Sequence, residues 1–120
     1  MREEVKNWLE QAQRDLDTAQ YLFAGKKYKD SSFYCQQAAE KSLKAVLISK
    51  KGELIKIHDL IKLSNLAGID PLLKNDCKEL TTVYIDARYP DTNLDEYSKE
   101  ETQEDLSRAG RIVQWAEKNI

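Results

Sequence analysis

Residues 31–51, SSFYCQQAAEKSLKAVLISKK, decide the fold of this chain. Their apolar side chains recur at the three- and four-residue spacing of a helix, so we expect a helix from near Asp30 to about Lys50, ended by Gly52. A helix with one solvent-exposed face needs only one apolar stripe, and this helix has two. We therefore expect it to be central, in contact with several neighbouring helices or with a second subunit. The first stripe contains Phe33, Gln36, Ala39, Leu43, Val46 and Leu47, and the second contains Tyr34, Ala38, Ala45 and Ile48.

On either side of this stretch, spacing and capping residues predict two more helices. Upstream, apolar residues recur with helical spacing from Val5 onward, and Gly25 is the expected stop of a long first helix. Downstream, Asp59 can cap a short helix that Gly68 ends.

Two further helices are expected towards the C-terminus. Asp70 and Pro71 pair an N-cap carboxylate with a proline at the first helical position, so a helix should start there and run towards Ala87. Pro90 then breaks it. Ser98 has a glutamate three residues later, the spacing of a capping box, which predicts a last helix with apolar positions up to the C-terminus.

The fold class predicted from these elements is all-α. No stretch alternates polar and apolar residues as a strand would, and no internal repeat is visible. We expect an antiparallel up-and-down bundle of four long helices plus a short fifth, forming one domain over residues 1–120.

The bulk composition excludes several classes of protein. Lys and Arg number 19 against 21 Asp and Glu, which leaves a net charge of −2 and no basic excess of the kind nucleic-acid-binding domains carry. Cys35 and Cys77 are too few and too far apart for a disulfide framework or a zinc site, so both are expected to be reduced. The sequence shows no signal-peptide pattern and no apolar run long enough to cross a bilayer. We therefore expect a soluble, cytoplasmic protein.

Few residues in the sequence are candidates for catalysis. His58 is the one histidine, next to the Asp59 cap, where a structural hydrogen bond is the common role. Glu40 and Lys41 lie mid-helix, where an ion pair or surface charge is favoured over acid–base chemistry. The sequence contains no metal-binding or phosphate-loop motif, so we expect no cofactor and no metal, and no enzyme that works alone.

The least generic segment is ARYPDTNLDEY, residues 87–97, at the proline-broken helix end. Arg88 offers a bidentate fork to a phosphate, and Tyr89 offers a stacking face, so the segment could contact an anion or a nucleotide. Alternatively, Arg88 pairs with a carboxylate and Tyr89 covers the edge of the core. The sequence leaves both interpretations open.

Several stretches taken in order resemble the HEPN (higher eukaryotes and prokaryotes nucleotide-binding) domain family: QQAAEKSLKA at 36–45, HDL at 58–60, YIDARYPD at 84–91 and RIVQWAEK at 111–118. The resemblance spans nearly the whole chain. It implies a bundle of about five helices that forms a homodimer. It also implies a nucleotidyltransferase partner encoded beside it, in a toxin–antitoxin-like pair. Active members of the family are metal-independent ribonucleases with an Arg, four to six residues, then a His.

That ribonuclease motif is not present here. None of the five arginines is followed by His at the required spacing, and Asn93 stands five residues after Arg88. Asp95 holds the position where some toxins carry a tyrosine that the partner modifies, and Tyr97 follows two residues later. We therefore expect a non-catalytic, homodimeric module that binds a nucleotide, a nucleotidyltransferase or both. The alternative is a ribonuclease that assembles Arg88 and His58 from separate segments. The candidate binding residues are His58, Lys41, Arg88, Tyr89 and Asp91.

Overall fold

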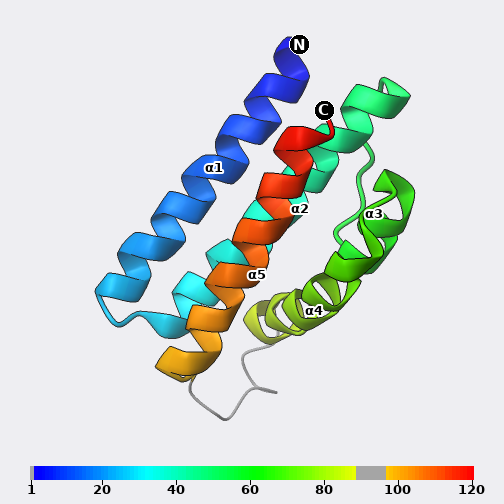
Figure 1. Cartoon of the computed structure of the whole chain (residues 1–120). Helices are drawn as coiled ribbons and strands as arrows, with labels where there is room; N and C mark the ends of the chain where they lie inside the picture. Colours follow the sequence, from blue (N-terminus) through cyan, green and yellow to red (C-terminus); the bar gives the residue numbers. More distant parts are fainter. Residues whose placement is uncertain (1, 89–96) are drawn as a thin grey trace.

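The computed structural model describes residues 2–88 and 97–120, with residues 85–88 described by their backbone alone. The described part of the chain is helical, with four long helices and a short one (Figure 1), and this confirms the predicted all-α class. The helices are α1 (Glu3–Ala24), α2 (Tyr28–Lys51), α3 (Leu60–Ala67), α4 (Lys74–Arg88) and α5 (Lys99–Lys118), with a 3-10 turn η1 (Pro71–Leu73) before α4.

The helix α2 lies at the centre of the bundle, as its two apolar stripes predict. It contacts each of the other four helices. In Figure 1 it lies behind α5, with α1 on one side and α3 and α4 on the other. Leu43 and Leu47 on α2 are fully buried and pack with Leu63, Leu80 and Ile112 in the main core. The central position follows because residues of both apolar stripes of α2 pack against apolar neighbours.

The predicted caps form at three of the helix starts. Asp59 accepts hydrogen bonds from the backbone N–H groups of the first turn of α3, and Asp70 accepts one from the backbone of η1. The Ser98 hydroxyl oxygen accepts from the backbone N–H of Glu101 at the start of α5. Each cap satisfies a donor that the first helical turn leaves unpaired.

Three details differ from the sequence-based expectation. The helix expected to start at Asp70 and Pro71 begins as the 3-10 turn η1, and α4 itself starts at Lys74. Gly25 ends α1, but its φ is −83°, and the left-handed residue is Lys26, with φ 63°. The helix α2 starts at Tyr28 rather than near Asp30. Its first turn is closed early by the hydrogen bond from the Ser31 N–H to the Lys27 carbonyl, and the Tyr28 ring packs edge-on against Phe23.

Both cysteines are buried thiols without a disulfide. Burial raises the pKa of Cys35, and it raises the pKa of Cys77 to about 11. Reactive cysteines have the opposite shift, so these two have structural roles in the core. None of the described helices combines the length and the apolar character needed to span a membrane.

Candidate ligand-binding site at His58

A buried carboxylate in the middle of α2 anchors the candidate site. The Glu40 side chain is 4% exposed, and Lys44, one helical turn later, lies 3.1 Å from it, Nζ to Oε2. Gln36, one turn earlier, donates from Nε2 to Glu40 Oε1 at 3.2 Å. A buried charge needs a partner and hydrogen bonds, and the i,i+4 spacing of these three residues supplies both from one helix.

His58 joins this cluster from the segment between α2 and α3. Its Nδ1 lies 3.0 Å from Glu40 Oε2, while its side chain remains 54% exposed. The imidazole is stacked on the ring of Tyr84 from α4, with ring centroids 6.1 Å apart and an angle of 15° between the planes. The ring of His58 is therefore held at one nitrogen and on one face, and half of it is accessible to a ligand.

The backbone of Arg88 lies one helical turn after Tyr84 on α4. Arg88 is the last residue of α4 and follows Tyr84 by four residues, so the two backbone positions lie on one face, one turn apart. The side chain of Arg88, and the whole of Tyr89, Asp91 and Asn93, lie outside the described residues. The fold thus brings His58 to the turn of α4 that precedes Arg88, although the sequence separates them by thirty residues.

Lys41 has a different set of contacts from its neighbour Glu40. Its Nζ lies 2.6 Å from Oδ2 of Asp15 on α1, and Gln11 donates to the other oxygen of that carboxylate at 3.0 Å. A small apolar notch of about 230 Å³ lies beside this ion pair, lined by Asn7, Trp8, Gln11 and Lys41. Glu40 and Lys41 are thus both ion-paired, but with separate partners.

Sequence analysis missed three residues of the His58 cluster: Gln36, Lys44 and Tyr84. Lys44 is 5% exposed, and its Nζ lies 5.5 Å from the centre of the Trp8 ring, a cation–π contact that covers it from the α1 side. The i,i+4 series Gln36–Glu40–Lys44 was a usable signal, because α2 was already expected to be covered on more than one side. Tyr84 begins the YIDARYPD stretch of the family resemblance, but no spacing in the sequence places it beside His58.

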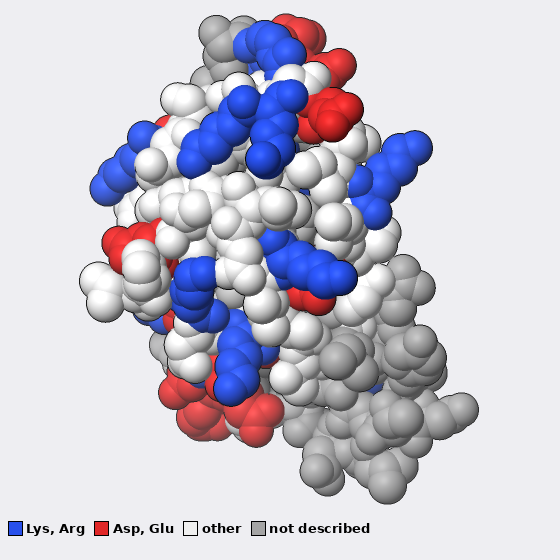
Figure 2. Space-filling view, turned by 90° about the vertical axis from the view of Figure 1, so that its right-hand side faces the viewer, with Lys and Arg blue, Asp and Glu red and all other residues white. Residues whose placement is uncertain are grey.

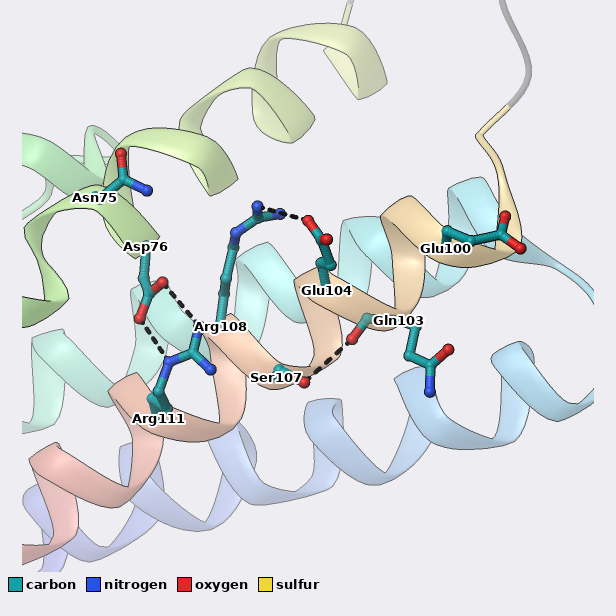
Figure 3. A pocket seen from close by; sticks show the side chains of 8 residues that line it. All are labelled: Asn75, Asp76, Glu100, Gln103, Glu104, Ser107, Arg108 and Arg111. Atoms are coloured by element: carbon teal, nitrogen blue, oxygen red, sulfur yellow. Dashed lines mark hydrogen bonds and ion pairs between the residues drawn. The ribbon is translucent and has the colours of Figure 1, made fainter.

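A second concave site lies between α4 and α5, with a volume of about 610 Å³ (Figure 3). Arg111 makes two hydrogen bonds to Asp76 across the helices, each of 2.9 Å. Arg108 pairs with Glu104 and Asp105 of its own helix at 3.0 and 2.9 Å. The remaining residues that line it are Asn75, Glu100, Gln103 and Ser107. Because both guanidinium groups already bind carboxylates, we interpret this concave site as the ion-paired contact between α4 and α5.

Two ionisable groups of α5, Asp105 and Arg111, have shifted pKa values. Burial raises the pKa of Asp105, although hydrogen bonds from Ser32 and Arg108 act in the opposite direction. Hydrogen bonding to Asp76 raises the pKa of Arg111. The raised pKa of Asp105 reflects the free-energy cost of burying its charge. The raised pKa of Arg111 reflects its ion pair with Asp76, which links α4 and α5.

On the described part of the face formed by α3 and α4, basic side chains are spread out rather than gathered in one continuous patch. Figure 2 shows Lys and Arg side chains spread over this face among uncharged residues, with acidic side chains mostly towards its edges. Within residues 2–84 and 97–120, no three His, Cys, Asp or Glu side chains gather as a metal site.

Comparisons with known proteins agree with this architecture. A protein of Methanocaldococcus jannaschii named "Putative toxin MJ1304" is 27% identical, over 92% of this chain and 84% of that protein. The crystal structure of TT1696 from Thermus thermophilus is 29% identical, with a TM-score of 0.89 over 99% of this chain and all of that one. The crystal structure of ST0689, an archaeal HEPN homologue, is also 29% identical, with a TM-score of 0.79 over 98% of each chain. The HEPN domain model matches residues 5–119, and the chain therefore belongs to the HEPN domain family.

Proposed function

We propose that this HEPN domain is a homodimeric binding module that holds a nucleotide, or a segment of a nucleotidyltransferase partner, around His58, Tyr84 and Arg88. The observation that carries the proposal is the half-exposed His58 ring, anchored by the buried Glu40 and stacked on Tyr84 one turn before Arg88. A side chain oriented by a buried carboxylate and yet left accessible is typical of a binding site.

The residue types fit a nucleotide. Arg88 provides a planar fork of donors that matches a phosphate, and the neighbouring aromatic rings provide faces and edges for a base. Tyr89 and Asp91, in the segment that follows, belong to the same proposed site. Lys41, on the side of α2 that faces α1, belongs to the proposed contact with a partner protein.

The nucleotide proposal is tested by thermal unfolding of the purified protein with ATP, GTP, CTP or UTP. One of them should raise the melting temperature saturably, because a ligand that binds only the folded state stabilises it. Arg88→Ala should abolish the rise while unfolding within about 2 °C of the parent without nucleotide. Arg14→Ala, which removes an exposed arginine on α1, is the matched control and should keep the rise. If Arg88→Ala unfolds much earlier instead, Arg88 is a structural residue and is not part of a binding site.

The homodimer has a separate test. Light scattering at micromolar concentration should give twice the mass of the 13.9 kDa chain. A monomeric mass would contradict the dimer, and it would leave the binding of a nucleotide to a single chain as a separate question. Co-expression with a nucleotidyltransferase, followed by co-purification, tests the partner.

The bond between Glu40 and His58 also supports a second candidate, a metal-independent ribonuclease. A carboxylate that orients an imidazole is the arrangement that many general bases use. Here His58 Nε2 would take the proton of an RNA 2′-OH as that oxygen attacks the phosphorus. The bond from phosphorus to the 5′-oxygen would break, and the imidazolium would protonate the leaving oxygen, while Arg88 offsets the phosphate charge.

This second candidate requires cleavage of a single-stranded RNA by highly purified protein. The activity should be lost in both His58→Ala and Arg88→Ala. Cleavage that survives both substitutions would come from a contaminant, and absence of cleavage in the parent would exclude the ribonuclease.

A further inference from the structure

We infer that the buried pair Glu40–Lys44 fixes the tautomer of His58, so that Nε2 accepts a hydrogen bond from a hydroxyl or amine of the ligand. The inference rests on the proposed binding at His58 and makes it more specific. Glu40 and Lys44 act as positioning residues, and the ligand phosphate is bound elsewhere in the site.

Hydrogen-bond geometry around Glu40 supports this assignment. Lys44 Nζ donates to Oε2 at 3.1 Å and Gln36 Nε2 donates to Oε1 at 3.2 Å. The Gln36 amide is itself oriented, because its Oε1 accepts a bond of 2.6 Å from Gln37. An ionised carboxylate only accepts hydrogen bonds, so the 3.0 Å contact with His58 requires the proton to be on Nδ1. In the neutral ring, the lone pair is then on Nε2.

The charge of Glu40 is balanced without His58. Glu40 already has Lys44 as its counter-ion, so the carboxylate does not need an imidazolium to neutralise it. The Lys44 ammonium is covered by the Trp8 ring, and the face of His58 is covered by Tyr84. A neutral Nε2 repels a phosphate oxygen, because both are acceptors, and it binds an N–H or O–H group.

The tautomer can be measured without any ligand. His58 is the only histidine in the chain, so protein labelled with ¹⁵N-histidine gives one imidazole in a long-range ¹H–¹⁵N spectrum. At pH 7.5 we expect a protonated Nδ1 and a lone pair on Nε2. A proton on Nε2 alone, or a ring protonated at both nitrogens at this pH, would overturn the inference.

A variant tests the positioning role. Glu40→Met/Lys44→Met removes the acceptor of Nδ1 without leaving an unpaired buried charge, and the preference for Nδ1–H should be lost. Asp15→Leu/Lys41→Met is the matched control, since it removes another ion pair of α2 that does not touch His58, and it should keep the parent tautomer. If the first variant also keeps the parent tautomer, Glu40 and Lys44 do not position the ring.

The ligand group is tested by calorimetry with ATP and two analogues. In 2′,3′-dideoxy-ATP the ribose hydroxyls are missing, and in ITP the base amine is replaced by an oxygen. One of them should bind the parent about tenfold more weakly than ATP, and the difference should vanish in His58→Ala. Equal losses in parent and variant, or no loss with either analogue, would contradict the assigned donor. If ATP fails to bind the parent at all, nucleotide binding and the assigned donor both fail for ATP, whereas the NMR result still decides the tautomer.

Discussion

The buried ion pair in α2 makes a strong prediction about stability: Lys44→Met should be far more destabilising than Glu40→Met/Lys44→Met. The side chains of Glu40 and Lys44 are 4% and 5% exposed, so the single variant leaves a carboxylate without its counter-ion and without water. Removing one partner of a buried pair costs roughly 3–5 kcal/mol. Because Gln36 and His58 still donate to Glu40, we expect the lower end, ~3 kcal/mol.

This free energy converts into a measurable shift. For 120 residues the entropy of unfolding is ~250 cal/mol/K, so a loss of ~3 kcal/mol lowers the melting temperature by ~12 °C. The double variant exchanges the pair for two apolar side chains of similar length, and it should lose less than ~1 kcal/mol, or ~4 °C. Lys51→Met, at the exposed end of the same helix, is the control and should change stability by less than ~0.5 kcal/mol.

Urea unfolding at pH 7.5, followed by circular dichroism, measures all three variants against the parent. The reasoning is wrong if Lys44→Met loses less than ~1 kcal/mol, because Glu40 would then be hydrated or uncharged in the folded protein. It is also wrong if the double variant is as unstable as the single one, since the loss would then come from packing rather than from an unpaired charge.

Three further predictions concern other parts of the fold. Burial raises the pKa of Asp105, so the folded state binds this proton more tightly and stability falls as pH rises through the interval between the ordinary and the raised value. Asp105→Asn should therefore unfold at a higher temperature than the parent at pH 7 but not at pH 3, and an equal effect at both would contradict this cause. Gly52→Ala, at φ 81°, should lower stability by ~1 kcal/mol, whereas Gly110→Ala inside α5, where a Cβ meets nothing within 4 Å, should raise it slightly in the same urea assay. Cys35 and Cys77 should not react with an aromatic disulfide reagent at pH 8 until the protein is unfolded, and rapid reaction of the native protein would place one of them in an open environment.

Much of the fold could be predicted because its signals are local. A cap such as Asp59 or Ser98 acts within its own first turn, and a left-handed stop such as Gly68 acts within the last turn. The two apolar stripes of α2 predicted its central position for the same reason, since one helix contains the whole pattern. The early start of α2 was missed because a ring contact between Phe23 and Tyr28 stabilises the turn, and that contact forms only after both helices exist.

The candidate site was only partly predictable, because its geometry comes from tertiary contacts. His58 was noticed as the single histidine, but its partners Glu40 and Tyr84 lie 18 and 26 residues away. No periodicity relates those positions. Arg88 was singled out by its chemistry, and its role stays a prediction that Arg88→Ala will test.

The buried pair of α2 shows how stability and function can be separated in this domain. A buried ion pair contributes little more to stability than two apolar side chains would, because desolvation offsets most of the attraction. What Glu40 and Lys44 provide, and an apolar pair cannot, is an acceptor that holds Nδ1 of a half-exposed imidazole. The double variant should therefore fold almost as well as the parent and bind nucleotide less well. A double variant that keeps full nucleotide affinity would mean that the orientation of His58 does not matter for binding, whatever the stability of the pair.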